Sequence, residues 1–104
     1  MLSEKIISMT NEQIKKEFYS AYLYLAIANF YEENGLCGFA NWFILQAEEE
    51  EKHAMKFCKY LHDNNAKVTL YSISAPNIKF DEFEDPLELS YRHEKEVTAS
   101  INNI

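Results

Sequence analysis

The stretch "AKVTLYSISAPNIKFDEFE", residues 66–84, contains Pro76 and has no helical period, although helical patterns lie on both sides of it. A connection of roughly twenty residues without regular structure is unusual inside a small domain. At about 3.3 Å per residue it can travel the ~40 Å length of the helix that precedes it. It can therefore return the chain to the other end of a bundle, so that the next helix runs parallel to the preceding one. We predict an all-α fold of the four-helix-bundle class with a long crossover connection.

Two long helices are predicted before the crossover. The first runs from Ser3 or Glu4 to Asn34, with Ser3 as its N-cap and Gly35 as the residue that stops it. The second runs from about residue 38 to residue 64 or 65, where the sequence "DNN" ends the helical pattern. The two Gly and two Pro residues of the chain leave few turns, which also favours long helices over many short strands.

A third helix is predicted after the crossover. Asp85 is its expected N-cap, Pro86 its first residue and Glu88 the third, which together form a start similar to a capping box. The pattern then continues to residue 104 without a Gly cap or a basic last turn. We therefore expect a single domain over residues 1–104 that is incomplete at its C-terminus. It would contain the first two helices, the crossover and part of the third helix.

Composition excludes several classes of function. The formal net charge of −7 disfavours nucleic acid and anionic membranes as partners, because both require clustered Lys and Arg. No apolar stretch of the sequence is long enough to span a membrane. Cys37 and Cys58 are isolated from each other, which predicts reduced core thiols of a cytoplasmic protein rather than a thiolate metal site.

The first predicted helix carries an apolar surface that one bundle cannot cover. Its segment "FYSAYLYLAIANFY", residues 18–31, is fourteen residues without a charge, whereas a surface helix normally keeps one polar face. An exposed apolar patch of this kind indicates a contact between subunits. We therefore expect a homo-oligomer. The expected patch consists of Tyr19, Leu23, Ala26 and Phe30.

Four consecutive glutamates lie in the second predicted helix, within "QAEEEEKH", residues 46–53. At about 100° per residue, the apolar side of this helix also carries Glu50, with His53 and Gln46 inside or beside the same arc. Glu49 lies at the boundary of that arc. The core side is defined by Phe39, Phe43, Phe57 and Leu61, and the solvated side by Glu48 and Glu51.

The other two predicted helices each offer one more glutamate to the interior. Glu17 lies on the apolar stripe of the first helix, and Glu94 lies on that of the third. An unpaired buried carboxylate costs several kcal/mol, and three close together repel one another unless they are protonated. A multivalent cation removes both penalties. Together with the imidazole of His53, three residues after Glu50, these oxygen ligands suit iron, manganese or zinc.

Each of these signals is weak on its own. A single glutamate on an apolar stripe is more often a partly exposed residue of a tilted helix, and a lone ExxH spacing is common. Three interior glutamates on three helices, one of them in an ExxH motif, form a much rarer coincidence. The metal site is therefore the favoured interpretation of the pattern.

Five short motifs resemble those of bacterial non-haem ferritin subunits, which belong to the ferritin-like di-iron family. The resemblance covers the whole chain in order. It implies a ferritin-like four-helix bundle with a di-iron ferroxidase site, in a cytoplasmic subunit that assembles into a hollow shell of twenty-four copies. Such a protein stores iron: it oxidises Fe(II) with O₂ or peroxide and keeps the Fe(III) mineral inside the shell. The motifs are "KKEFYSAYLY" (15–24), "QAEEEEKH" (46–53), "SAP" (74–76), "DP" (85–86) and "YRHEKE" (91–96).

The resemblance also implies roles for the four candidate ligands. Glu17 would be a terminal ligand of the first iron, and Glu50 would bridge the two irons. His53 would bind the first iron through an imidazole nitrogen, and Glu94 would bind the second iron.

Three further positions follow from the same resemblance. Tyr24 matches the tyrosine near the site that is thought to donate an electron; the less favoured alternative is an ordinary core aromatic residue. Glu49 matches a residue that helps to hold a third iron nearby. Haem-containing bacterioferritins carry Met directly after the bridging Glu, and here that position is Glu51, so we expect no haem.

The chain departs from the family in its length. A ferritin subunit is about half as long again and supplies further ligands from a fourth helix, so this chain alone would not complete the bundle. It is expected to be either a fragment, which we favour, or a chain that pairs with another to rebuild the bundle. Two other functions remain open: a non-catalytic assembly module that uses the surface "YLYLAIANFY", residues 22–31, and a di-iron peroxidase similar to rubrerythrin. The sequence carries no sign of the Cys-rich domain that usually accompanies the second.

Overall fold

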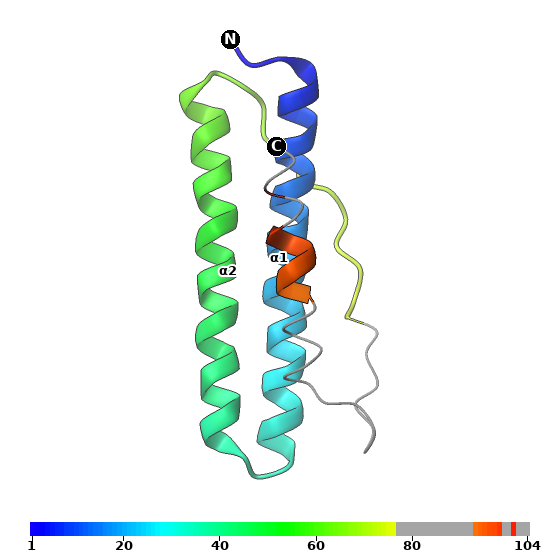
Figure 1. The fold of residues 1–104 in the computed structure, drawn as a ribbon, viewed down its shortest axis with the longest axis vertical. Coiled ribbons are helices and arrows are strands. Elements are labelled where there is room, and N and C mark those ends of the chain that lie inside the picture. Colours follow the sequence, from blue (N-terminus) through cyan, green and yellow to red (C-terminus); the bar gives the residue numbers. More distant parts are fainter. Residues whose placement is uncertain (77–92, 99–100, 102–104) are drawn as a thin grey trace.

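The computed structural model describes residues 1–76, 93–98 and 101. Helix α1 comprises Glu4–Glu33 and helix α2 comprises Cys37–Asp63. The two helices lie antiparallel and side by side along their whole length (Figure 1). The predicted long helices are therefore confirmed, and their bounds differ from the predicted ones by one or two residues.

Both ends of α1 are set by the residues that the sequence singled out. Ser3 is extended, and its side chain accepts a hydrogen bond of 3.2 Å from the Ile6 backbone N–H. Gly35 has a φ of +75°, which glycine adopts without steric cost. In this conformation the backbone N–H of Leu36 donates to the carbonyl of Tyr31 at 2.9 Å. This closing pattern is a Schellman motif, and it satisfies carbonyls that a helix end would otherwise leave bare.

Helix α2 ends in the same way without a glycine. Asn65 takes the left-handed conformation, with a φ of +58°, which asparagine tolerates better than most residues. The N–H of Ala66 then donates to the carbonyl of Leu61 at 2.8 Å. The predicted stop at "DNN" is confirmed, and its physical basis is the left-handed asparagine.

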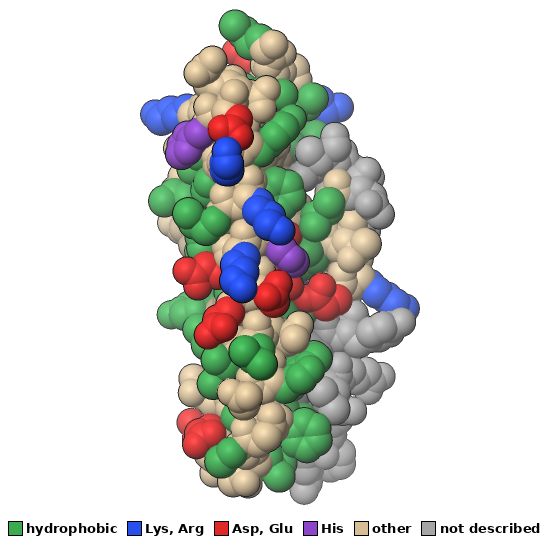
Figure 2. Space-filling view, turned by 90° about the vertical axis from the view of Figure 1, so that its left-hand side faces the viewer, with side chains coloured by type: hydrophobic (Ala, Val, Ile, Leu, Met, Phe, Trp, Pro, Cys, Tyr) green, Lys and Arg blue, Asp and Glu red, His purple; other side chains and the backbone are tan. Residues whose placement is uncertain are grey.

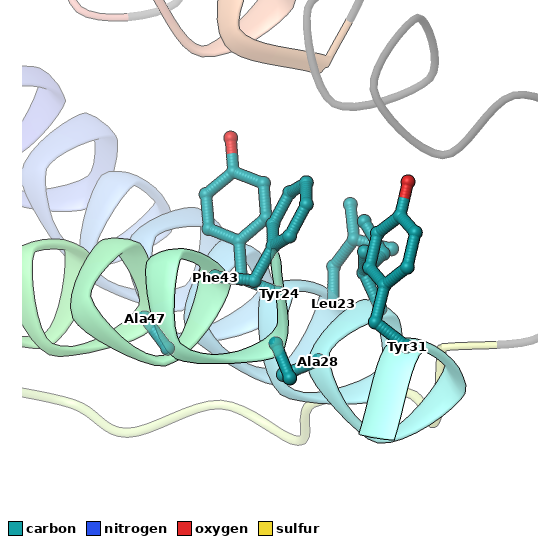
Figure 3. Close-up of a cluster of buried hydrophobic side chains, with 8 residues drawn as sticks. Leu23, Tyr24, Ala28, Tyr31, Phe43 and Ala47 are labelled. Atoms are coloured by element: carbon teal, nitrogen blue, oxygen red, sulfur yellow. The ribbon is translucent and has the colours of Figure 1, made fainter. Parts of the chain in front are cut away.

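The two helices bury their core in two clusters on either side of a polar layer. The larger cluster lies near the α1–α2 turn, where the rings of Tyr24, Tyr31 and Phe43 project to one side of the helix pair (Figure 3). Tyr31 stacks on Phe43 with ring centroids 5.7 Å apart. The second cluster lies toward the far end of the pair. Its buried members are Ile14, Ala54 and Leu61.

Two expectations about exposure were wrong. Leu23, predicted in an exposed patch, is only 2% exposed because it packs in the larger cluster between the helices. Phe39, predicted in the core, is 50% exposed because it lies in the first turn of α2, at the end of the helix pair. Figure 2 shows the side of the molecule formed by α2, where charged side chains gather among hydrophobic ones. The large exposed hydrophobic residues of α1 and α2 are Tyr22, Leu25, Phe39, Trp42, Ile44, Leu45, Met55 and Tyr60.

The crossover begins as predicted. Residues 66–76 form no helix or strand and run back beside α1 from the end of α2 (Figure 1). The buried side chain of Asn11 holds them there. Its Nδ2 donates to the carbonyl of Lys67 at 3.2 Å, and its Oδ1 accepts from the N–H of Thr69 at 2.8 Å. The rest of the expected crossover and the expected helix start at residues 85–88 lie outside the described residues.

A third helical segment, residues 93–98, packs against α1. His93 contacts Ser20, while Val97 lines a surface pocket together with Lys16, one turn earlier in α1. The segment therefore runs antiparallel to α1 and parallel to α2, as the crossover argument predicted (Figure 1). Among the described residues, neither helix has an apolar window that could cross a membrane. Both cysteines are free thiols, but the expected core position was wrong for Cys37, which is exposed because it is the first residue of α2.

Candidate metal centre

Glu17, Glu50 and His53 meet between α1 and α2, in the polar layer that separates the two hydrophobic clusters. The side chains of both glutamates are buried, since Glu17 is 0% exposed and Glu50 is 4% exposed. One ligand atom from each of the three residues lies within 4.8 Å of the other two. His53 Nδ1 is 3.6 Å from Glu17 Oε2 and 3.7 Å from Glu50 Oε2. Both glutamates therefore point inward, as predicted.

The two oxygens that face His53 lack hydrogen-bond partners. Among the described residues, Glu17 Oε2 and Glu50 Oε2 are the buried side-chain atoms without one. Leaving a buried carboxylate oxygen unsatisfied costs about 1–3 kcal/mol or more. A cation with ligands at about 2.0–2.2 Å holds neighbouring ligand atoms roughly 3.0–3.6 Å apart, which is close to the separations seen here. Two carboxylates and one imidazole form a donor set that suits iron, manganese or zinc.

The electrostatics of the cluster also favour a bound cation. Burial raises the pKa of Glu50 from 4.5 to about 9, and the neighbouring carboxylates of Glu17 and Glu94 contribute to the rise. The metal-free protein therefore keeps a proton on Glu50 at neutral pH. A cation that replaces this proton removes the repulsion among three acidic side chains.

We expect the stability of the metal-free protein to fall as the pH rises toward 9. The folded state holds the Glu50 proton up to a pH of about 9, whereas the unfolded chain releases it near 4.5. Unfolding between these values therefore releases a proton, so a higher pH favours the unfolded state. The urea midpoint of chelator-treated protein, measured between about pH 5 and pH 9, should decrease. Glu50→Gln should flatten this dependence; an equal slope in wild type and variant would show that another group is responsible.

Tyr24 and Glu94 lie close to the cluster, since the charge of Glu94 acts on Glu50 and the charges of Glu17 and Glu50 act on Tyr24. The buried Tyr24 hydroxyl donates a hydrogen bond to Glu94 Oε1 in the third helical segment. Burial raises the pKa of the Tyr24 phenol, and the bond to Glu94 raises it further. Glu94 is half-buried, and its charge acts on Glu50. It does not belong to the group of residues with mutually close ligand atoms, which consists of Glu17, Glu50 and His53. Tyr24 thus connects Glu94 to α1.

Glu49 is the sequence-predicted site residue that lies apart. Its side chain is exposed on α2 and forms an ion pair of 3.5 Å with Lys52. In the described part of the chain, Glu49 does not lie beside Glu17 and Glu50. Its role in holding a further iron therefore stays a prediction.

Two residues near the site escaped the sequence argument. Gln13 is buried and donates from Nε2 to Glu17 Oε1 at 3.2 Å. His93 lies off the interior arc of the expected third helix, yet its Nε2 is 2.7 Å from Ser20 Oγ. Ser20 Oγ also reaches the carbonyl of Lys16 at 2.9 Å. When Ser20 donates to that carbonyl, the donor to Ser20 is His93 Nε2–H; in the other imidazole tautomer Ser20 donates to Nε2. The spacing of Gln13, four residues before Glu17, is a signal that could have been used. Nothing comparable was available for His93.

Known proteins match along the chain. The family described as Ferritin-like domain matches residues 7–104. The bacterial non-heme ferritin of Campylobacter jejuni is 38% identical over all 104 residues, and that of Staphylococcus aureus is 35% identical. The chain spans 62% and 63% of the length of these two proteins.

Solved structures agree with these sequence matches. An open-pore ferritin of the archaeon Archaeoglobus fulgidus superimposes with a TM-score of 0.94 at 39% identity, over 99% of this chain and 64% of that one. A humanized archaeal ferritin superimposes with a TM-score of 0.94 at 37% identity, over 99% and 62%. With relatives more than one third identical and a family match along nearly its whole length, the chain belongs to the ferritin family, and its helices are part of a ferritin-type four-helix bundle.

Proposed function

We propose that the complete protein stores iron and oxidises its substrate, Fe(II), at the centre formed by Glu17, Glu50 and His53. The observation that supports this most is the pair of buried, unpartnered carboxylate oxygens that face one imidazole nitrogen. The relatives named as bacterial non-heme ferritins support the same reaction class.

The chemistry follows from the donor set. Negatively charged oxygen ligands stabilise Fe(III) more than Fe(II), so they make loss of an electron easier. Two irons held side by side can give two electrons to one oxidant, O₂ or peroxide, which avoids one-electron radicals. In this proposal Glu50 would hold both irons, Glu17 and His53 would hold the first, and Glu94 would hold the second. Glu17 and Glu50 are buried, whereas the side chain of His53 is 44% exposed.

We further propose Tyr24 as an electron donor to this reaction. A phenol that loses an electron also loses its proton, so it needs a proton acceptor within hydrogen-bond reach. Glu94 Oε1 already accepts the Tyr24 hydroxyl bond, and it can take that proton. One electron would then pass from the ring to the O₂ or peroxide that is reduced at the centre, while the phenol proton moves to the Glu94 carboxylate. Glu49, exposed and close to Lys52, is the proposed ligand of a third iron.

The proposed assembly is a homo-oligomeric cytoplasmic shell of twenty-four subunits that holds the Fe(III) mineral. Exposed aromatic and aliphatic residues such as Tyr22, Leu25 and Trp42 provide apolar surface for contacts between copies. Glu51, exposed directly after Glu50, stands where haem-containing relatives have Met, so the proposed shell binds no haem.

Anaerobic titration of the complete gene product with Fe(II), followed by calorimetry, tests this function. We expect saturable, stoichiometric binding per subunit. The competing function, a non-catalytic helical assembly module, requires no bound metal. A titration without saturable binding would therefore favour the module and exclude the ferroxidase centre.

A further inference from the structure

We infer that Gln13 is a positioning residue that orients the Glu17 carboxylate for cation binding. The inference rests on the proposed metal centre and adds to it a residue that touches no metal. It concerns which oxygen of Glu17 faces Glu50 and His53, and what holds that oxygen in place.

Gln13 and Glu17 form a buried pair on one face of α1. Their side chains are 1% and 0% exposed, and Gln13 Nε2 is 3.2 Å from Glu17 Oε1. Residues four apart on a helix lie one above the other, so this contact needs no distortion of the backbone. The orientation of the amide is also determined, because an ionised carboxylate only accepts hydrogen bonds. The NH₂ end of Gln13, and not its carbonyl end, must face Glu17.

The hydrogen bond makes the two oxygens of Glu17 different. Oε1 is occupied by the Gln13 amide, whereas Oε2 has no partner and lies 3.6 Å from His53 Nδ1. The last torsion of a glutamate side chain is broad, so a free carboxylate would rotate among several directions. Gln13 therefore selects the orientation of the Glu17 carboxylate in which Oε2 faces Glu50 and His53. A group arranged in this way before the cation arrives binds it more tightly.

Two neighbouring buried polar residues of α1 bond backbone groups instead of a carboxylate. Thr10 donates from Oγ1 to the carbonyl of Ile6 at 2.7 Å, and Asn11 bonds the backbone of the crossover. Both hydrogen bonds satisfy backbone groups and so serve the fold. Gln13 instead directs its amide to a carboxylate of the candidate centre, which places its role in the site.

Binding of Co(II) under anaerobic conditions to the complete gene product provides the test. The variants are Gln13→Met, which keeps the size of the side chain but has no N–H, and Gln13→Asn, which keeps the amide but shortens its reach. Thr10→Val is the matched control, because it removes a buried side-chain hydrogen bond one turn away on the same helix. Each protein is measured for Co(II) affinity, for the visible absorption spectrum of the bound ion, and for the urea midpoint without metal.

We expect both Gln13 variants to bind Co(II) about 10–100-fold more weakly, with a shifted spectrum. Thr10→Val should change the urea midpoint but neither the affinity nor the spectrum. If wild type binds no Co(II), the proposed metal centre fails and the inference fails with it. If wild type binds Co(II) and either folded Gln13 variant matches it in affinity and spectrum, the inference alone is overturned.

Discussion

Replacement of Glu50 by Ala should abolish fast Fe(II) oxidation by the complete protein while leaving its helix content intact. Glu50 is the proposed bridge, and its Oε2 is one of the two buried oxygens that lack a partner. Loss of residues that only support a metal ligand costs about 10–100-fold, so loss of the bridge itself should lower the rate by more than ~100-fold. Alanine is a strong helix former, so α2 should persist.

Stopped-flow absorbance of Fe(III) formation measures this effect, with circular dichroism as the check on helix content. Glu51→Ala is the matched control, because it removes an exposed carboxylate from the next position of the same helix. Its rate should be that of wild type. Rapid oxidation by the Glu50→Ala protein would show that the proposed centre is wrong.

Replacement of Phe43 by Ala should destabilise the protein by about 3–5 kcal/mol. Phe43 is completely buried, and its ring lies against three others, those of Tyr24, Tyr31 and Trp42. Alanine would leave a cavity in the larger hydrophobic cluster, and Tyr31 would lose one of its stacked ring contacts (Figure 3). Urea unfolding followed by circular dichroism measures the loss.

Phe43→Leu is the control for this prediction. Leucine refills most of the space and keeps the apolar character, so the loss should shrink to roughly 1–1.5 kcal/mol. Equal and small losses for both variants would mean that Phe43 does not hold the two helices together. Because neither variant removes a proposed metal ligand, the loss of stability reports on packing and not on the metal centre.

Several features of this protein could be predicted because they depend on local chemistry. The ends of α1 and α2 follow from Ser3, Gly35 and Asn65, whose side chains or backbone conformations act within a few residues of each helix end. The turn of 100° per residue placed Glu17 and Glu50 on inward faces, and both are buried. The resemblance of short motifs to ferritin subunits was confirmed by the family match. The ligand roles of the site residues remain predictions.

Other features depend on how segments pack, and a single helix does not contain that information. The periodicity of α1 placed Leu23 on an exposed patch, but packing of α1 against α2 and the third helical segment buries more than one arc. Phe39 lies on the predicted core side, yet its position at the end of the helix pair leaves it half exposed.

Sequence alone determined the all-α class, the long helices, the crossover and the inward direction of Glu17 and Glu50, because capping and helical period act over short distances. Tertiary structure alone decided that the Glu17 and Glu50 oxygens face one nitrogen of His53, that Gln13 occupies the other Glu17 oxygen, and that His93 bonds Ser20. Helical period gives a direction but no distance, and hydrogen bonds and metal coordination depend on tenths of an ångström between atoms on different turns or different helices.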